Sequence, residues 1–162
     1  MVRTGRPDIR LTVVGGAGFA PNAPLTPYEK SLRRVAAPAE DRIRFVPFTA
    51  RADVPRRLGA ADVTVVPSTW PDPCPLTVLE GAASGAAVVA SRIGGIPEIA
   101  GPAPGATLVR PGDVDELAGV LRGFAESPAA LSRAQAAAAA YAQSHEASWD
   151  LALATLQGAL DG

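Results

Sequence analysis

The stretch of sequence that decides the fold is ADVTVVPSTWPDPCPLTVLEGAASG, residues 61–85. It begins with a β-branched apolar run over residues 63–66, continues through a proline-rich loop, and from residue 76 has the composition of a helix. In an open parallel α/β sheet, ligands bind beyond the carboxyl ends of the strands. The loop and the start of the helix are therefore expected on the side of the sheet where a ligand binds.

Similar apolar runs recur along the chain at a spacing of roughly 20 residues. Several are nearly continuous in apolar residues, as expected for strands covered on both faces, and helix-length segments separate them. The alternation predicts an α/β fold with a Rossmann-like, doubly wound parallel sheet. The expected strands are residues 11–14, 43–46, 63–66, 87–90 and 107–109, and the expected helices are residues 28–36, 54–60, 76–84 and 114–125 and a long segment from residue 128.

Two helix starts are marked by capping residues. Asp113 is followed three residues later by Glu116, as in a capping box, and Ser127 precedes a first-turn proline. The sequence Asp113-Val114-Asp115 also matches a D-x-D metal motif, but its position at a helix start favours the cap. No bound metal is expected.

Size and composition exclude several classes of protein. The chain has 162 residues, the size of one domain, and its 48% hydrophobic and 19% charged residues are typical of a folded globular protein. A net charge of −1 gives no reason to expect nucleic acid as a partner. No apolar run approaches the roughly 18 residues of a transmembrane segment, and no secretory signal is recognised, so the expected location is cytoplasmic. The single cysteine, Cys74, agrees with a reducing compartment.

The helix start after the loop has the chemistry of an anion site. Unpaired backbone N–H groups and the positive end of the helix dipole suit a diphosphate, and Leu76, Thr77 and Val78 are the expected donors. Asp72 lies before the helix and Glu80 about one turn inside it. Their carboxylates are good acceptors for sugar hydroxyls on either side of the diphosphate.

At this point the sequence resembles a known family. The stretch is similar to the donor-site motif of family-4 retaining glycosyltransferases of the GT-B fold, in which two glutamates are separated by seven residues. Here the pattern is D-x7-E, from Asp72 to Glu80. The similarity covers nearly the whole chain and includes Val14-Gly15-Gly16, Ile43-Arg44-Phe45, Ala61-Asp62, Gly85, Val88-Val89, Gly94-Gly95-Ile96-Pro97-Glu98, Pro111-Gly112-Asp113 and Ser148-Trp149-Asp150.

The resemblance implies that residues 1–162 are one nucleotide-sugar-binding domain, the C-terminal half of a GT-B enzyme. That enzyme would transfer a sugar from a nucleotide-diphosphate sugar to an acceptor, with retention of anomeric configuration and without a metal or other cofactor. Asp72 would contact hydroxyls of the transferred sugar, and Glu80 would hold the ribose hydroxyls. The amides of Leu76 and Thr77 would bind the diphosphate.

The resemblance also implies contacts outside this motif. Pro47, Phe48 and Thr49 would pass beside the nucleotide base. Gly15 and Gly16 fit the resemblance and are counted as nucleotide contacts, although their spacing is not that of a dinucleotide fingerprint and a tight turn explains them better. Cys74 is counted as a contact of the loop and not as a nucleophile, because no histidine lies nearby in sequence to activate it.

The family's domain usually begins with a central strand that carries a Gly-Arg signature followed by a lysine. We expect the chain to lack this strand, which would leave the strands at Val13 and Val65 without their shared neighbour, and to lack the acceptor domain, so that a further domain or a partner chain completes the enzyme. The chain alone would be weakly active or inactive. A GT-B-like sugar-nucleotide epimerase and a non-catalytic nucleotide-sugar-binding or assembly module are the alternatives. The epimerase is disfavoured because no constellation suited to proton abstraction is evident.

Overall fold

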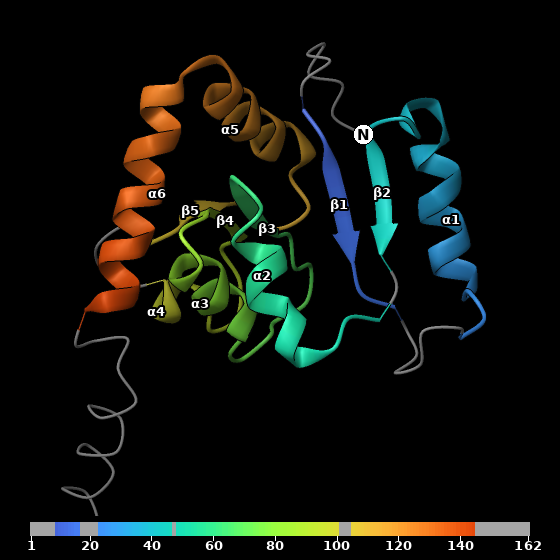
Figure 1. The fold of residues 1–162 in the computed structure, drawn as a ribbon, viewed down its shortest axis with the longest axis horizontal. Helices are drawn as coiled ribbons and strands as arrows, with labels where there is room; N and C mark the ends of the chain where they lie inside the picture. Colours follow the sequence, from blue (N-terminus) through green and yellow to red (C-terminus); the bar gives the residue numbers. More distant parts are fainter. Residues whose placement is uncertain (1–8, 17–22, 47, 101–104, 145–162) are drawn as a thin grey trace, which may run out of the picture. The chain divides into compact units, whose positions relative to one another are not determined.

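The computed structural model describes residues 9–16, 23–46, 48–100 and 105–144 (Figure 1). The chain divides into two compact units, Met1–Val54 and Pro55–Gly162, and each is described by itself. The predicted α/β architecture with parallel strands is confirmed. A single donor domain over residues 1–162 stays a prediction. Within the described ranges, no helix has both the length and the apolar character needed to cross a membrane.

The first unit contains a two-stranded parallel sheet. Strands β1 and β2 pair in register, from Leu11 opposite Ile43 to Val14 opposite Val46. Helix α1 begins at Pro27 because the side chain of Thr26 accepts a hydrogen bond from the Glu29 N–H, and the Glu29 carboxylate accepts one from the Thr26 N–H in return. The elements are β1 (Leu11–Val14), α1 (Pro27–Ala36), the 3₁₀ helix η1 (Ala37–Ala39), β2 (Ile43–Val46) and the 3₁₀ helix η2 (Arg51–Asp53).

Helix α2 (Val54–Leu58) begins at the division between the units, and the second unit has a three-stranded parallel sheet in the order β3-β4-β5. The strand and helix bounds predicted for this part of the chain agree with the structure to within about two residues, a margin that is ordinary for element ends. Helix α4 was not expected. The elements are β3 (Val63–Val66), α3 (Leu76–Ala83), β4 (Ala87–Ser91), α4 (Ile96–Ile99), β5 (Thr107–Val109), α5 (Val114–Glu126) and α6 (Pro128–Gln143).

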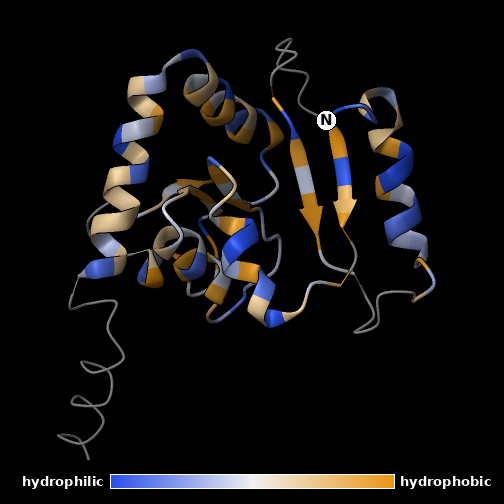
Figure 2. Ribbon diagram, viewed as in Figure 1, coloured by the Kyte–Doolittle hydropathy of each residue, from blue (hydrophilic) through white to orange (hydrophobic). Residues whose placement is uncertain are grey.

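The core of the second unit is built around β4, all five residues of which are buried. Helices α3 and α6 both pack on β4 and on each other, so they cover the same face of the sheet (Figure 1). Helix α6 is mostly pale orange in Figure 2 because it is rich in alanine. These small side chains let α6 lie close to α3. The cluster on this face comprises Val66, Val78, Ala82, Val88, Ala90, Ile96, Ala100, Ala106 and Ala138.

A glycine sets the distance between α3 and β3. The backbone of Gly81 faces Thr64, and a Cβ at Gly81 would lie 3.0 Å from the Thr64 Cβ and Cγ2 atoms. That separation is closer than ordinary van der Waals contact, so a side chain at this position would push the helix away from the sheet. The close packing of α3 on β3 fixes the helix that begins after the proline-rich loop.

We expect Gly81→Ala to be destabilising relative to Gly119→Ala. Both glycines lie inside helices, where alanine is favoured by about 1 kcal/mol, but a Cβ at Gly119 meets nothing within 4 Å. The overpacking at Gly81 should make the two changes in unfolding free energy differ by about 1–3 kcal/mol. Urea unfolding of both variants measures this difference, and equal stabilities would contradict the packing described.

Candidate functional site

The loop between β3 and α3, residues 67–75, follows the carboxyl end of β3 and is held by hydrogen bonds around Asp72. The Asp72 N–H donates to the Trp70 carbonyl at 2.9 Å, and Asp72 Oδ1 accepts from the Cys74 N–H at 3.1 Å. The second bond is an Asx-turn, which an aspartate makes with the backbone two residues on. Prolines at positions 71, 73 and 75 restrict the remaining torsions, so the loop has a defined path into α3.

The start of α3 leaves backbone N–H groups open. Its N-cap is Pro75, which makes no side-chain cap bond, and within the described residues the N–H groups of Leu76 and Thr77 have no recorded acceptor. The expectation for Val78 is wrong, because its N–H already donates to the Pro75 carbonyl at 3.0 Å. Two amides, those of Leu76 and Thr77, therefore remain for a ligand, at the positive end of the helix dipole.

Helical periodicity places Glu80 on the same face of α3 as the side chains of Leu76 and Thr77. Leu76 and Thr77 are exposed and precede Glu80 by four and three residues, so the three side chains share one face. The opposite face packs into the core through Val78 and Ala82, which are 2% and 1% exposed. Glu80 itself is half-buried.

The two other loop candidates differ in how they are engaged. Asp72 is half-buried, with Oδ1 occupied by the Asx-turn and no partner recorded for Oδ2 among the described residues. That second oxygen is the one left to accept from a ligand hydroxyl. The Cys74 thiol is exposed and forms no disulfide. The structure thus brings Asp72, Cys74, Leu76, Thr77 and Glu80 together on one strand–loop–helix segment.

The remaining predicted contacts belong to the first unit. Gly15 has a φ of +116°, and its N–H continues the β1–β2 ladder by donating to the Val46 carbonyl. The tight turn stays a prediction, because residues 17–22 lie outside the described part of the chain. Gly16 lies beside Glu29. Phe48 is 38% exposed, and the Thr49 hydroxyl is buried with no recorded partner in the described part of the chain. Pro47 lies outside the described residues. A contact of these five residues with nucleotide stays a prediction.

One close contact of the loop was not foreseen from the sequence. Gly94 and Gly95, here called the glycine turn, follow β4 and lie against the backbone of residues 71–73. The Gly95 N–H donates to the Asp72 carbonyl at 2.9 Å. A pair of glycines shortly after a buried strand was the available signal, because such a pair often marks a close approach of two backbones. The sequence alone did not show which segment the pair approaches.

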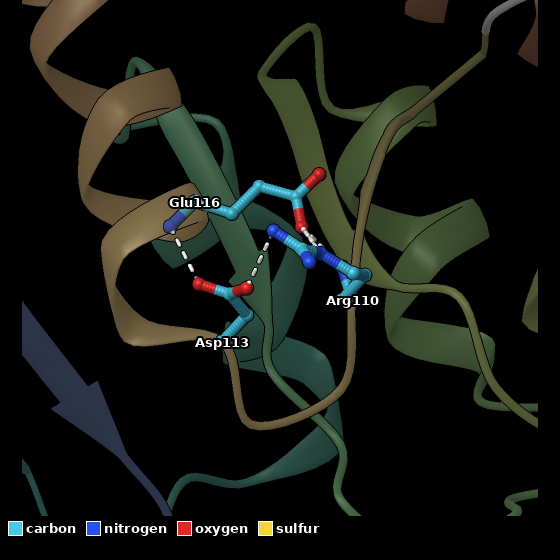
Figure 3. A network of polar contacts seen from close by, with 3 residues as sticks. All are labelled: Arg110, Asp113 and Glu116. Atoms are coloured by element: carbon cyan, nitrogen blue, oxygen red, sulfur yellow. Dashed lines mark hydrogen bonds and ion pairs between the residues drawn. The ribbon is translucent and has the colours of Figure 1, made fainter.

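The carboxyl end of β5 carries a charged cluster, shown in Figure 3. Arg110 contacts Glu116 through Nε at 2.8 Å and Asp113 through a terminal nitrogen at 2.8 Å, and the Glu116 N–H donates to Asp113 Oδ1 at 2.8 Å. Asp113 is therefore the N-cap of α5, as predicted, and the D-x-D resemblance has this structural explanation. Among the described residues, no three His, Cys, Asp or Glu side chains are grouped so that they could hold a metal ion.

Comparison with known proteins identifies the class of this chain: an α/β domain of the glycosyltransferase GT-B superfamily. The family described as glycosyl transferases group 1 matches residues 1–127. The chain belongs to this family.

Curated relatives agree with the family. The chain is 35% identical over 138 residues to the D-inositol 3-phosphate glycosyltransferase of Mycobacterium avium, covering 83% of the chain and 32% of the relative. It is 30% identical over 156 residues to a GDP-mannose-dependent mannosyltransferase of Corynebacterium glutamicum, covering 93% of the chain and 38% of the relative. The chain thus spans less than two fifths of the length of either relative.

Solved structures show the same fold. HepE of Anabaena in complex with UDP superposes with a TM-score of 0.73 at 29% identity, over 85% of this chain and 36% of that protein. HepE has also been solved with UDP-glucose. Sucrose-phosphate synthase of Thermosynechococcus elongatus gives a TM-score of 0.77 at 26% identity, over 97% of this chain and 39% of that protein.

The Arg110 cluster predicts a dependence of stability on pH. The Arg110 guanidinium, and after it the Arg110 N–H, hydrogen-bond to Glu116 and hold the pKa of its carboxyl below the ordinary value. Because the pKa is lower in the folded than in the unfolded state, the stabilisation is complete above the ordinary pKa of about 4.3 and is lost as the pH falls through the folded value. Glu116→Gln should therefore be destabilising at neutral pH and should approach wild-type stability in acid.

Urea unfolding at pH 7 and at about pH 3 measures the change, since the lower pH lies below the ordinary glutamate pKa. Glu126→Gln, in the last turn of the same helix and outside the cluster, is the matched control for removing one carboxylate. A stability difference between wild type and Glu116→Gln that is the same at both pH values would contradict the assignment.

Proposed function

We propose that the segment from Asp72 to Glu80 binds a nucleotide-diphosphate sugar, and that the protein to which this chain belongs is a family-4 retaining glycosyltransferase. The Leu76 and Thr77 amides bind the diphosphate. Asp72 Oδ2 accepts from a hydroxyl of the transferred sugar, and Glu80 accepts from the ribose hydroxyls. Phe48 and Thr49, together with Pro47, Gly15 and Gly16, belong to the proposed nucleotide contacts of the first unit.

The observation that carries the proposal is the open start of α3. Two adjacent backbone N–H groups lie at the positive end of a helix with no acceptor among the described residues, with one carboxylate before the helix and another one turn inside it. This arrangement suits a ligand that is negatively charged in the middle and carries hydroxyl groups at both ends. A nucleotide-diphosphate sugar has that distribution of charge and donors.

In the proposed reaction, the bond between the anomeric carbon and the diphosphate breaks as the acceptor oxygen bonds to that carbon. The nucleoside diphosphate leaves and takes up the proton of the acceptor hydroxyl. The helix start stabilises the charge that develops on the leaving diphosphate, as preorganised donors do in other active sites. Arg92 is exposed after the carboxyl end of β4 and adds a positive charge at this edge of the sheet. Neither a metal nor another cofactor is part of the proposal. The proposed location is cytoplasmic, in agreement with the single free cysteine.

The names of the relatives support transfer of a sugar to an acceptor, and the HepE complexes support a uridine nucleotide as one donor to test. The acceptor would be bound by a further domain or by a partner chain. The isolated chain is accordingly expected to bind the donor and to turn it over weakly or not at all. Release of UDP from UDP-glucose at the rate of an ordinary transferase would overturn that part of the proposal.

The role of the helix start is tested by Leu76→Pro. Proline is tolerated at the first helical position, and Pro75 already has the extended backbone that the residue before a proline requires, so the fold should be kept. The substitution removes one N–H, and binding of UDP should weaken by about tenfold, the effect of one hydrogen bond to a charged group. Leu76→Ala shortens the same side chain but keeps the amide. Calorimetry that gave equal UDP affinity for the two variants would contradict the assignment.

The proposed roles of the Asp72 and Glu80 carboxylates are distinguished by comparing ligands with and without the sugar. Glu80→Ala should weaken UDP and UDP-glucose equally, by about 10- to 100-fold, because the ribose is common to both. Asp72→Asn should weaken only UDP-glucose. GDP with GDP-mannose and ADP with ADP-glucose are measured in the same way, because the base is not assigned, and Glu126→Gln is the control. No binding of any of these ligands to the wild-type chain would favour a structural or assembly role instead.

A further inference from the structure

The glycine turn touches the backbone of the β3–α3 loop at the residue that carries the proposed sugar contact. Besides the hydrogen bond from the Gly95 N–H to the Asp72 carbonyl, the two backbones are too close for side chains. A Cβ at Gly94 would overlap the Asp72 carbonyl oxygen and lie 2.8 Å from the Asp72 nitrogen, and a Cβ at Gly95 would overlap the Pro73 carbonyl oxygen. Gly94 also has a φ of +58°, a conformation that favours glycine.

The glycine turn is itself fixed to the core of the second unit. Ile96, the next residue, is fully buried in the cluster beneath α3 and α6, and Ile93 on the other side packs against the same cluster. The Ile96 N–H donates to the Ile93 carbonyl at 3.2 Å, which closes the turn. A turn flanked by one buried and one partly buried isoleucine, both packed in the same cluster, has little freedom to move relative to the core.

The segment around Asp72 is therefore held from three directions. Its N–H donates to Trp70, its carbonyl accepts from Gly95, and its Oδ1 accepts from Cys74. The first and third bonds lie within the loop and fix its shape. The bond to Gly95 is the one that ties this shape to the core, and so it fixes where Asp72 Oδ2 lies relative to the start of α3.

We infer that the glycine turn is a positioning element for Asp72: it touches no ligand and acts by holding the Asp72 carboxylate where the donor sugar binds. The inference rests on the proposed function. A group misplaced by an ångström loses most of its effect on a bound ligand. Displacing the loop should therefore remove the contribution of the sugar to binding and leave the diphosphate contacts of α3 in place.

The test compares each glycine with a matched one. Gly95→Ala is paired with Gly119→Ala, and Gly94→Ala with Gly85→Ala, since Gly85 has a φ of +83° but its Cβ would meet nothing within 4 Å. Calorimetry gives the dissociation constants for UDP and UDP-glucose, and for the GDP, GDP-mannose and ADP, ADP-glucose pairs. For each pair, the dissociation constant of the nucleotide divided by that of the nucleotide sugar measures what the sugar contributes to binding. We expect this ratio to fall by about tenfold in Gly94→Ala and Gly95→Ala, as in Asp72→Ala, and to stay unchanged in both controls.

A double mutant tests whether the glycine turn acts through Asp72. In an Asp72→Ala background, Gly95→Ala should cause no further loss of the sugar contribution, because residues that act through one another are not additive. Additive losses would overturn the inference. The inference would also be overturned if Gly95→Ala weakened the binding of UDP and of UDP-glucose equally, because a merely structural role would lower both affinities.

Two further outcomes are separable. If the wild-type chain binds UDP-glucose but Gly95→Ala keeps the full sugar contribution, the inference fails and the proposed function stands. If the wild type binds none of the ligands, the proposed function fails and the inference with it. Should Gly95→Ala not fold, amide hydrogen exchange of Gly95 in the wild type replaces it: exchange should be slower with UDP-glucose than with UDP, and equal rates would overturn the inference.

Discussion

The arrangement of the second unit depends on the burial of β4 on both faces. A strand with no exposed residue must lie between other strands and beneath helices, and β4 pairs with β3 on one side and β5 on the other while α3 and α6 cover one face. Because all three strands are parallel, their carboxyl ends meet at one edge. The loop after β3 and the turn after β4 leave the sheet side by side, and the hydrogen bond between Asp72 and Gly95 joins them there.

Much of this fold could be predicted from local sequence. The five strands were found because each is a short run rich in β-branched and apolar residues. The starts of α5 and α6 were found because Asp113 and Ser127 are capping residues whose side chains accept hydrogen bonds in the structure. Helix α4 escaped prediction because four residues, one of them Pro97, are too few to show a helical period. The division of the strands between two sheets also depends on long-range pairing, to which no local pattern points.

The candidate site divides in the same way. The chemistry of Asp72, Leu76, Thr77 and Glu80 could be read from the sequence because the four lie within one strand–loop–helix segment, whose local geometry sets their arrangement. Three features could not be predicted from the sequence. The Val78 N–H donates to the Pro75 carbonyl, one oxygen of the Asp72 carboxylate is engaged in an Asx-turn, and the glycine turn contacts the backbone of the loop. Each depends on where one backbone group meets another, and residue types alone do not specify that.

The glycine turn holds the β3–α3 loop through main-chain atoms of residues 71–73. The side chains of Trp70, Cys74 and Leu76 are exposed and take no part in this anchor. The exposed side chains next to the proposed site can therefore change while the path of the backbone stays the same. A library varied at these three positions would search sugar preference directly, without first having to recover a folded protein.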